Sequence, residues 1–213
     1  MAKSPIKVPK NRLTPTEGQH LIELLKELAI VPDHRTFILA GDGSGSGWNM
    51  SCAWASVSID WQTRERRVWY GYANPGSVNL AEGMAYVHPL SWILNQDLAA
   101  KNKGEERRTP RVHVITDSQY VRDLLNRRDK RIAGANATLG AIFNAVERHG
   151  IILQGHWKER LTVDLNRYTD ALSRFVRESL KAWRAEQELI RLNDGTLGFT
   201  PYDFNPDETE YPG

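Results

Sequence analysis

Residues 112–121, VHVITDSQYV, join a strand to a helix and decide the fold of this chain. The first four residues are rich in β-branched side chains, which favour a strand. Ser118 can cap a helix whose apolar side begins at Val121. Asp117 therefore lies where a strand ends and a helix begins.

Segments on either side of this stretch extend the pattern into one sheet. Apolar residues at helical spacing predict helices within 21–28, 80–95, 121–125, 139–146 and 172–183, and strand patterns mark 37–40, 52–60, 67–73, 112–115 and 151–153. The first helix should follow a capping box formed by Thr14 and Glu17, and we expect Pro89 to kink or end the second helix. Hairpins followed by strand–helix–strand crossovers predict an α/β fold, in which one mixed sheet carries helices on its faces.

Chain length and cysteine content narrow the class of protein. The 213 residues suit one domain with extensions, because a domain takes about 150 residues. The single cysteine, Cys52, excludes a disulfide scaffold and is typical of a core residue in a protein kept reduced in a cytoplasm or nucleus. No run approaches the roughly 18 apolar residues of a membrane helix, and no signal peptide is visible. We therefore expect a cytoplasmic protein without a membrane partner.

The net charge of +2 is unevenly distributed along the chain. Residues 1–12 carry four basic residues and no acid, whereas residues 192–213 carry five acids and no base, which leaves +3 for the rest. A mildly basic body permits a polyanionic partner without requiring one.

Four acidic residues stand where the predicted strands and helices meet. Asp42 follows the first predicted strand and Asp117 follows the fourth, so parallel pairing of these strands would bring the two carboxylates together. Such like charges are unfavourable unless a cation lies between them or one takes a proton. Glu82 and Asp170, near the starts of two helices, can reach the same edge. Oxygen donors without a cysteine or histidine cluster suit Mg²⁺ or Mn²⁺ rather than Zn²⁺.

These residues lie in motifs that resemble those of the ribonuclease H family. The similar motifs are Thr116-Asp117-Ser118-Gln119-Tyr120-Val121, Asp42-Gly43-Ser44, Asn79-Leu80-Ala81-Glu82, Asn166-Arg167-Tyr168-Thr169-Asp170 and Gly155-His156. They occur in family order over residues 36–185. The resemblance implies a five-stranded mixed sheet in the order 3-2-1-4-5 with helices on both faces. It covers neither terminus. Together with the charge pattern it predicts a basic arm and helix at residues 1–33, a catalytic domain at 34–185 and an acidic tail at 186–213.

The resemblance also implies an activity, namely endonucleolytic hydrolysis of the RNA strand of RNA–DNA hybrids by a monomer with two Mg²⁺ ions, which Mn²⁺ can replace. Asp42 would bridge both ions, Glu82 and Asp117 would complete one, and Asp170 would hold the other. His156 would assist proton transfer or product release, although an ordinary loop histidine is an equal alternative.

Several polar residues are candidates for contact with the hybrid. The resemblance assigns Asn79 and Gln119 to sugar or base edges, and Ser44 and Asn166 to further substrate contact; each could instead be a cap or turn residue. A basic stretch could bind phosphates or simply form a solvated helix end, and its members are Arg127, Arg128, Lys130 and Arg131. Trp157 could stack on the DNA strand or lie in the core.

Two other functions remain open. Metal-dependent DNA nucleases and resolvases of the same fold use similar acids, but the T-D-S-Q-Y match and Asn79 favour hybrids. A catalytically silent nucleic-acid-binding module is the second alternative, although such a module has no evident reason to keep four repelling carboxylates together.

Overall fold

The structure, a computed structural model, describes residues 12–45, 50–104, 109–126, 137–159 and 164–193. One five-stranded sheet runs in the order β3-β2-β1-β4-β5. Its strands are β1 (Thr36–Gly45), β2 (Met50–Asp60), β3 (Arg66–Gly76), β4 (Arg111–Thr116) and β5 (Ile152–Trp157). The first three strands pair antiparallel, whereas β4 is parallel to both β1 and β5. The predicted mixed sheet and its strand order are thus confirmed.

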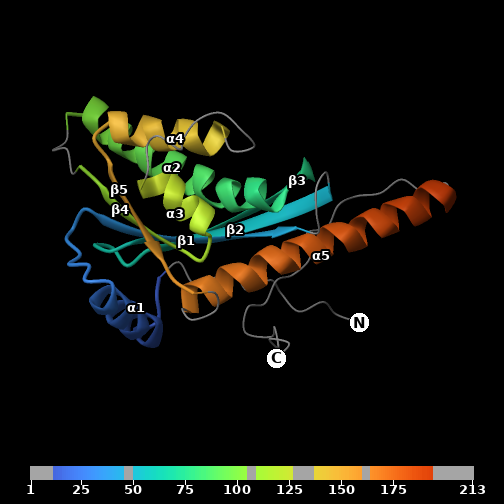
Figure 1. The fold of residues 1–213 in the computed structure, drawn as a ribbon, viewed down its shortest axis with the longest axis horizontal. Helices are drawn as coiled ribbons and strands as arrows, with labels where there is room; N and C mark the ends of the chain where they lie inside the picture. The colour runs from blue at the N-terminus through green and yellow to red at the C-terminus, as the bar shows by residue number, and fades with distance from the viewer. Residues whose placement is uncertain (1–11, 46–49, 105–108, 127–136, 160–163, 194–213) are drawn as a thin grey trace.

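Helices cover both faces of this sheet (Figure 1). The described helices are α1 (Pro15–Glu27), α2 (Val78–Asn102), α3 (Gln119–Asn126), α4 (Ala137–Arg148) and α5 (Asp164–Asn193). In Figure 1, α2, α3 and α4 lie on one side of the sheet, and α1 and α5 lie on the other. This arrangement confirms the α/β fold with helices on both faces.

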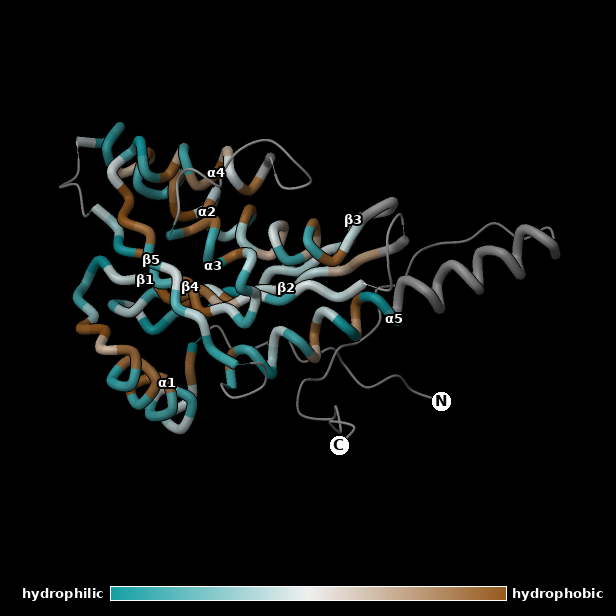
Figure 2. Tube along the Cα trace, in the orientation of Figure 1, coloured by the Kyte–Doolittle hydropathy of each residue, from teal (hydrophilic) through white to brown (hydrophobic). Residues whose placement is uncertain are grey.

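Each face of the sheet has its own hydrophobic core. On the α2 side, strand residues such as Leu39 and Val114 pack against Tyr86 and Phe143 from the helices. The second core joins Leu21, Leu24, Leu25 and Ile30 to strand residues Ile38, Val57, Ile59 and Ile115. The predicted capping box starts α1, since Thr14 and Glu17 each accept a hydrogen bond from the other's backbone. Along α1, apolar residues recur between polar ones, which gives the helix one apolar side to pack on the sheet (Figure 2).

The first strand is longer than its sequence predicts. We expected it at residues 37–40, ending before the glycine-rich segment, but β1 continues to Gly45. Asp42 therefore lies inside the strand, where it pairs with Ala55 of β2, and not after it. The glycines do not end the strand because the antiparallel ladder with β2 continues through them. The parallel ladder with β4, however, ends at Ala40.

Helix α2 does not end at Pro89, contrary to one of the two expected outcomes. It runs from Val78 to Asn102 with Pro89 buried inside it. The helix contacts all three antiparallel strands and also α3 and α4. These contacts outweigh the lost hydrogen bond of one proline.

The last described helix, α5, crosses a predicted domain boundary. Its backbone remains helical to Asn193, eight residues past the expected end of the catalytic domain at 185. The domain limits otherwise remain predictions. Among the described residues, no helix is both long and apolar enough to span a membrane.

Candidate carboxylate site

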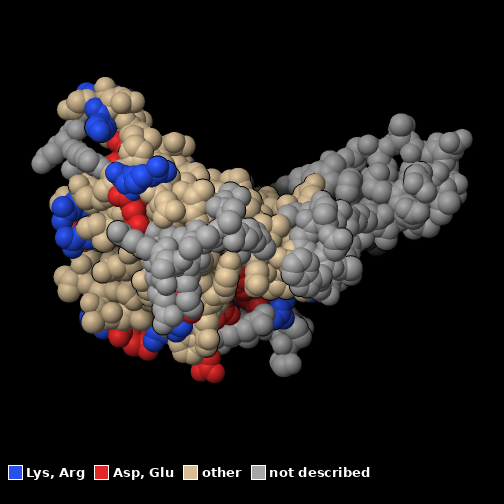
Figure 3. All heavy atoms as spheres, turned by 45° about the horizontal axis from the view of Figure 1, so that its top comes forward, with Lys and Arg blue, Asp and Glu red and all other residues tan. Residues whose placement is uncertain are grey.

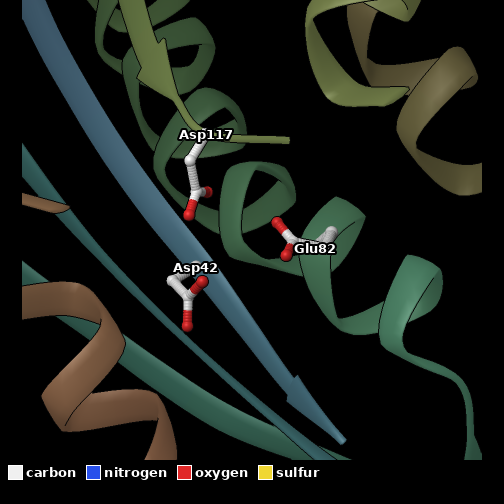
Figure 4. Close-up of side chains that lie close together, drawn as sticks. All are labelled: Asp42, Glu82 and Asp117. Carbon is white, nitrogen blue, oxygen red and sulfur yellow. The ribbon is translucent and has the colours of Figure 1, made fainter. Parts of the chain in front are cut away.

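Three of the four predicted acids converge. Asp42, Glu82 and Asp117 each offer one carboxylate oxygen, and these oxygens all lie within 4.8 Å of one another. In Figure 4 the three carboxylates point into one common space from β1, α2 and the end of β4. We call these residues the carboxylate triad.

The sheet places the two aspartates of the triad. Beyond the last β1–β4 pair, Ala40 with Ile115, β1 continues beside β2 alone while β4 ends at Thr116. Asp42 and Asp117 therefore lie on either side of the point where the two strands separate. Asp42 is only 5% exposed. A buried carboxylate beside two others requires a compensating positive charge or a proton.

Two glycines of β1 bring α2 close enough for Glu82 to join the aspartates. A Cβ on Gly43 would lie 2.3 Å from the backbone nitrogen of Glu82, and one on Gly41 would lie 2.9 Å from Cβ of Ala85. Only hydrogen fits at either position, so the first turns of α2 rest directly on the backbone of β1. The Asp42-Gly43-Ser44 motif therefore provides a packing surface for α2.

Hydrogen bonds to the backbone at and beside Asp117 hold this residue in place. Ser118 caps α3 as predicted, since its hydroxyl accepts a hydrogen bond from the Val121 amide. The indole nitrogen of Trp157 donates to the Asp117 carbonyl at 3.1 Å, and the Lys158 amide donates to Thr116. Trp157 is 43% exposed and so is not a core residue. It forms part of the surface beside the triad.

Tyr86 lies beneath the triad and was missed by sequence reasoning. It follows Glu82 by one helical turn, is fully buried, and donates its hydroxyl hydrogen bond to the Gly41 carbonyl at 2.9 Å. Burial raises the pKa of Tyr86 well above its usual value, and the negative charges of Glu82, Asp117 and Asp42 raise it further, against a hydrogen bond with Thr116. The phenol therefore remains a neutral donor. Its position on the Glu82 face of α2 is the signal that could have identified it.

The fourth acid, Asp170, lies on α5 outside the group of three. It is 5% exposed, and Arg174 lies 3.2 Å from one of its carboxylate oxygens. One turn further along α5, the Ser173 hydroxyl donates to Asp42 Oδ2 at 2.6 Å. Helix α5 therefore reaches the triad through a serine that no motif had singled out.

His156 lies on β5 and hydrogen-bonds another histidine. Its Nε2 is 3.0 Å from Nδ1 of His113 on the neighbouring strand. Burial lowers the pKa of both rings, that of His113 to about 4. The structure does not bring His156 into the carboxylate group, so its catalytic role stays a prediction.

The predicted substrate contacts differ in accessibility. Asn79 and Gln119 are exposed, three residues before Glu82 and two after Asp117. Ser44 is buried on β1, and Asn166 is a buried amide without a hydrogen-bond partner among the described residues. The basic stretch of Arg127, Arg128, Lys130 and Arg131 lies outside the described residues.

The triad fits a hard divalent cation. Three carboxylates from three elements supply only oxygen ligands, which Mg²⁺ and Mn²⁺ prefer. A bound cation would also offset the repulsion among the three charges.

Comparison with known proteins identifies the fold. No protein-family model and no curated protein matches the sequence. Among solved structures, the N-terminal RNase H domain of rv2228c from Mycobacterium tuberculosis is 16% identical, with a TM-score of 0.54, over 70% of this chain and 98% of that one. LC11-RNase H1 in complex with an RNA/DNA hybrid is 17% identical, with a TM-score of 0.52, over 68% of this chain and 99% of that one. These similarities, together with the strand order β3-β2-β1-β4-β5, show that the chain has the ribonuclease H-like fold.

Proposed function

We propose that this chain is a metal-dependent endoribonuclease that hydrolyses the RNA strand of RNA–DNA hybrids. The observation that carries the proposal is the convergence of Asp42, Glu82 and Asp117 at the point where β1 and β4 separate. The fold of two RNase H structures, one of them bound to a hybrid, supports the same substrate class.

In the proposed mechanism, acidic side chains would hold divalent ions beside the scissile phosphodiester. The triad would hold one Mg²⁺ or Mn²⁺ ion, and Asp42 and Asp170 would hold a second. Bound ions activate the attacking water and stabilise the leaving oxygen of the phosphodiester. Arg174 contacts one carboxylate oxygen of Asp170, so this arginine would compete with a cation for that oxygen. His156 would assist proton transfer or product release after leaving His113.

Substrate binding is proposed to combine polar contacts with phosphate binding. Asn79 and Gln119 are exposed beside two members of the triad and would meet sugars or base edges. Ser44 and Asn166 are buried, and Ser44 would meet the RNA through its backbone. In the view of Figure 3 the described Lys and Arg side chains form several separate groups with Asp and Glu between them. From their sequence, residues 127–131 are the proposed source of concentrated, salt-dependent phosphate binding. We further propose that the enzyme is a cytoplasmic monomer.

Cleavage of defined nucleic acids tests this function. The protein is incubated with labelled RNA–DNA hybrid, duplex DNA, branched DNA and single-stranded RNA in Mg²⁺. We expect cleavage of the RNA strand of the hybrid, and a loss of at least about 100-fold in rate for Asp117→Asn, because the variant removes a charged ligand. Asp123→Asn is the matched control: this acid is on α3 and pairs with Arg122, outside the triad.

Other outcomes point to the two alternatives. Cleavage of branched DNA in place of the hybrid would identify a DNA nuclease of the same fold. Hybrid binding without cleavage, insensitive to divalent ions, would identify a catalytically silent binding module. Full activity of Asp117→Asn would reject the carboxylate mechanism.

A further inference from the structure

We infer that Ser173 is a positioning residue of the carboxylate centre, which orients Asp42 and sets the distance between α5 and β1. This inference rests on the proposed function, since it concerns the ligands of the same metal site. Ser173 belongs to none of the motifs that identify the acids. Its role follows from contacts in the structure.

The Ser173 hydroxyl has two acceptors and one proton. Its Oγ lies 2.6 Å from Asp42 Oδ2 and 3.0 Å from the backbone carbonyl of Asp170. Hydrogen bonds to a carboxylate are shorter and stronger than those to a neutral carbonyl. The short distance therefore indicates that the Ser173 hydroxyl proton points toward Asp42 Oδ2, which accepts the hydrogen bond. The contact with Asp170 is the local one that helical serines commonly make.

Burial makes this hydrogen bond consequential. Ser173 is 0% exposed and Asp42 is 5% exposed, so water does not readily replace the hydroxyl. A carboxylate has about four acceptor positions on its two oxygens. By engaging Oδ2 from the α5 side, Ser173 limits rotation of the Asp42 carboxylate relative to Glu82 and Asp117.

The same serine connects the two parts of the proposed site. Asp170 precedes it by one turn of α5, so the position of Ser173 against β1 also determines how far Asp170 lies from Asp42. A second contact between α5 and β1 lies one helical turn beyond Ser173, where Arg177 donates a hydrogen bond to the Gly45 carbonyl at 3.5 Å. Ser173 and Arg177 are on the same face of α5. Together they fix the helix to β1 at two points.

The test compares cation binding by matched serine variants. Mn²⁺ binding without substrate is measured by calorimetry for the wild type, Ser173→Ala, Ser173→Cys and Ser173→Thr. Partners of ligating side chains typically contribute about 10- to 100-fold to metal affinity. We expect that loss for the alanine and cysteine variants, whereas threonine, which keeps the hydroxyl, should stay within about 3-fold of the wild type.

Ser56→Ala is the matched control. Ser56 is also 0% exposed, but its hydroxyl has no hydrogen-bond partner among the described residues. Its replacement should leave Mn²⁺ affinity unchanged. The cysteine variant keeps a side chain of similar size with a weak donor, so it reports on the hydrogen bond even when the alanine variant folds poorly.

Failure of the inference can be told apart from failure of the proposed function. A wild type that neither binds Mn²⁺ saturably nor cleaves hybrid would overturn the proposed function, and this inference with it. A wild type that binds Mn²⁺, together with Ser173→Ala or Ser173→Cys variants of equal affinity, would overturn the role of Ser173 alone. Equal losses in Ser173→Thr and Ser173→Ala would also overturn it.

Discussion

His113 is a residue whose protonation is linked to folding. Burial, together with His156 and Arg111, lowers its pKa from 6.5 to about 4, against an opposing effect of Asp33. Between these two pH values the unfolded chain binds a proton that the folded protein excludes. The stability that depends on a neutral His113 is therefore fully present above pH 6.5 and is lost as the pH falls toward 4.

We expect the free energy of unfolding to fall by about 3 kcal/mol as the pH falls through this range, since one pKa unit corresponds to about 1.4 kcal/mol. Urea unfolding of the wild type at pH 7.0, 5.5 and 4.5 should show it, and His113→Gln should lower the pH dependence. His149→Gln, the same change at an exposed histidine, should keep the wild-type dependence. Identical pH profiles for all three proteins would contradict this account.

At the residue scale, sequence patterns identify the proposed metal ligands better than the residues that support them. Asp42, Glu82 and Asp117 were predicted because each sits in a motif with a chemical reason for an acid. Ser173 and Tyr86 were not, because a buried hydroxyl is recognised only through the partner that folding brings to it. Asp42 and Ser173 are 131 residues apart in the chain, and no local pattern relates them.

The contact between α2 and β1 positions Glu82. Because a Cβ on Gly43 would meet backbone atoms of Ala81 and Glu82 at 2.7 and 2.3 Å, any side chain there must push the start of α2 away from the strand. Backbone atoms of a packed helix cannot turn aside as a flexible side chain can. The short distance between α2 and β1 therefore requires glycine at position 43, because its side chain is a single hydrogen atom.

Gly43→Ala should therefore lower both stability and Mn²⁺ affinity. We expect a destabilisation of about 1–3 kcal/mol, as overpacking usually costs, and at least about 10-fold weaker Mn²⁺ binding because Glu82 is displaced. Gly18→Ala on α1 is the control, since a Cβ there has no atom within 4 Å and should stabilise the helix by about 0.5–1 kcal/mol. Thermal unfolding and Mn²⁺ calorimetry measure both effects. Wild-type affinity in Gly43→Ala would show that the contact does not position Glu82.

At the element scale, the existence and type of each element were predictable, but limits set by packing were not. The local sequence near Gly41 and Gly43 favours a turn, yet the ladder with β2 carries β1 on to Gly45. Pro89 would weaken an isolated helix, yet contacts with strands and helices sustain α2 beyond it. In both cases tertiary contacts overrode the local preference.

Across the whole molecule, α1 is part of the folded unit and not a loose extension. Its leucines share one core with Ile38 of β1, Ile115 of β4 and two residues of β2. Segments on either side of residue 33 therefore bury one common surface, and the domain limit there remains a prediction. Both α1 and α5 lie on the same side of the sheet (Figure 1).

This shared core predicts cooperative unfolding. Leu25, 2% exposed, should cost about 2–5 kcal/mol when replaced by alanine, because a buried leucine leaves a cavity. Val31→Ala, at a residue 87% exposed, should change stability by less than about 0.5 kcal/mol. Denaturant unfolding followed by far-ultraviolet circular dichroism and by tryptophan emission should give one coincident transition. An early, separate loss of helix signal would instead show that α1 unfolds independently.

The hydrogen bond between the Trp157 indole and the Asp117 carbonyl has an optical consequence. It fixes a partly exposed fluorophore against the backbone of a proposed metal ligand, at the rim where a nucleic acid would arrive. Indole emission responds to nearby charge and to solvent. The molecule thus carries one of its seven tryptophans at the carboxylate centre, where its emission would respond to the cation and hybrid binding that we propose.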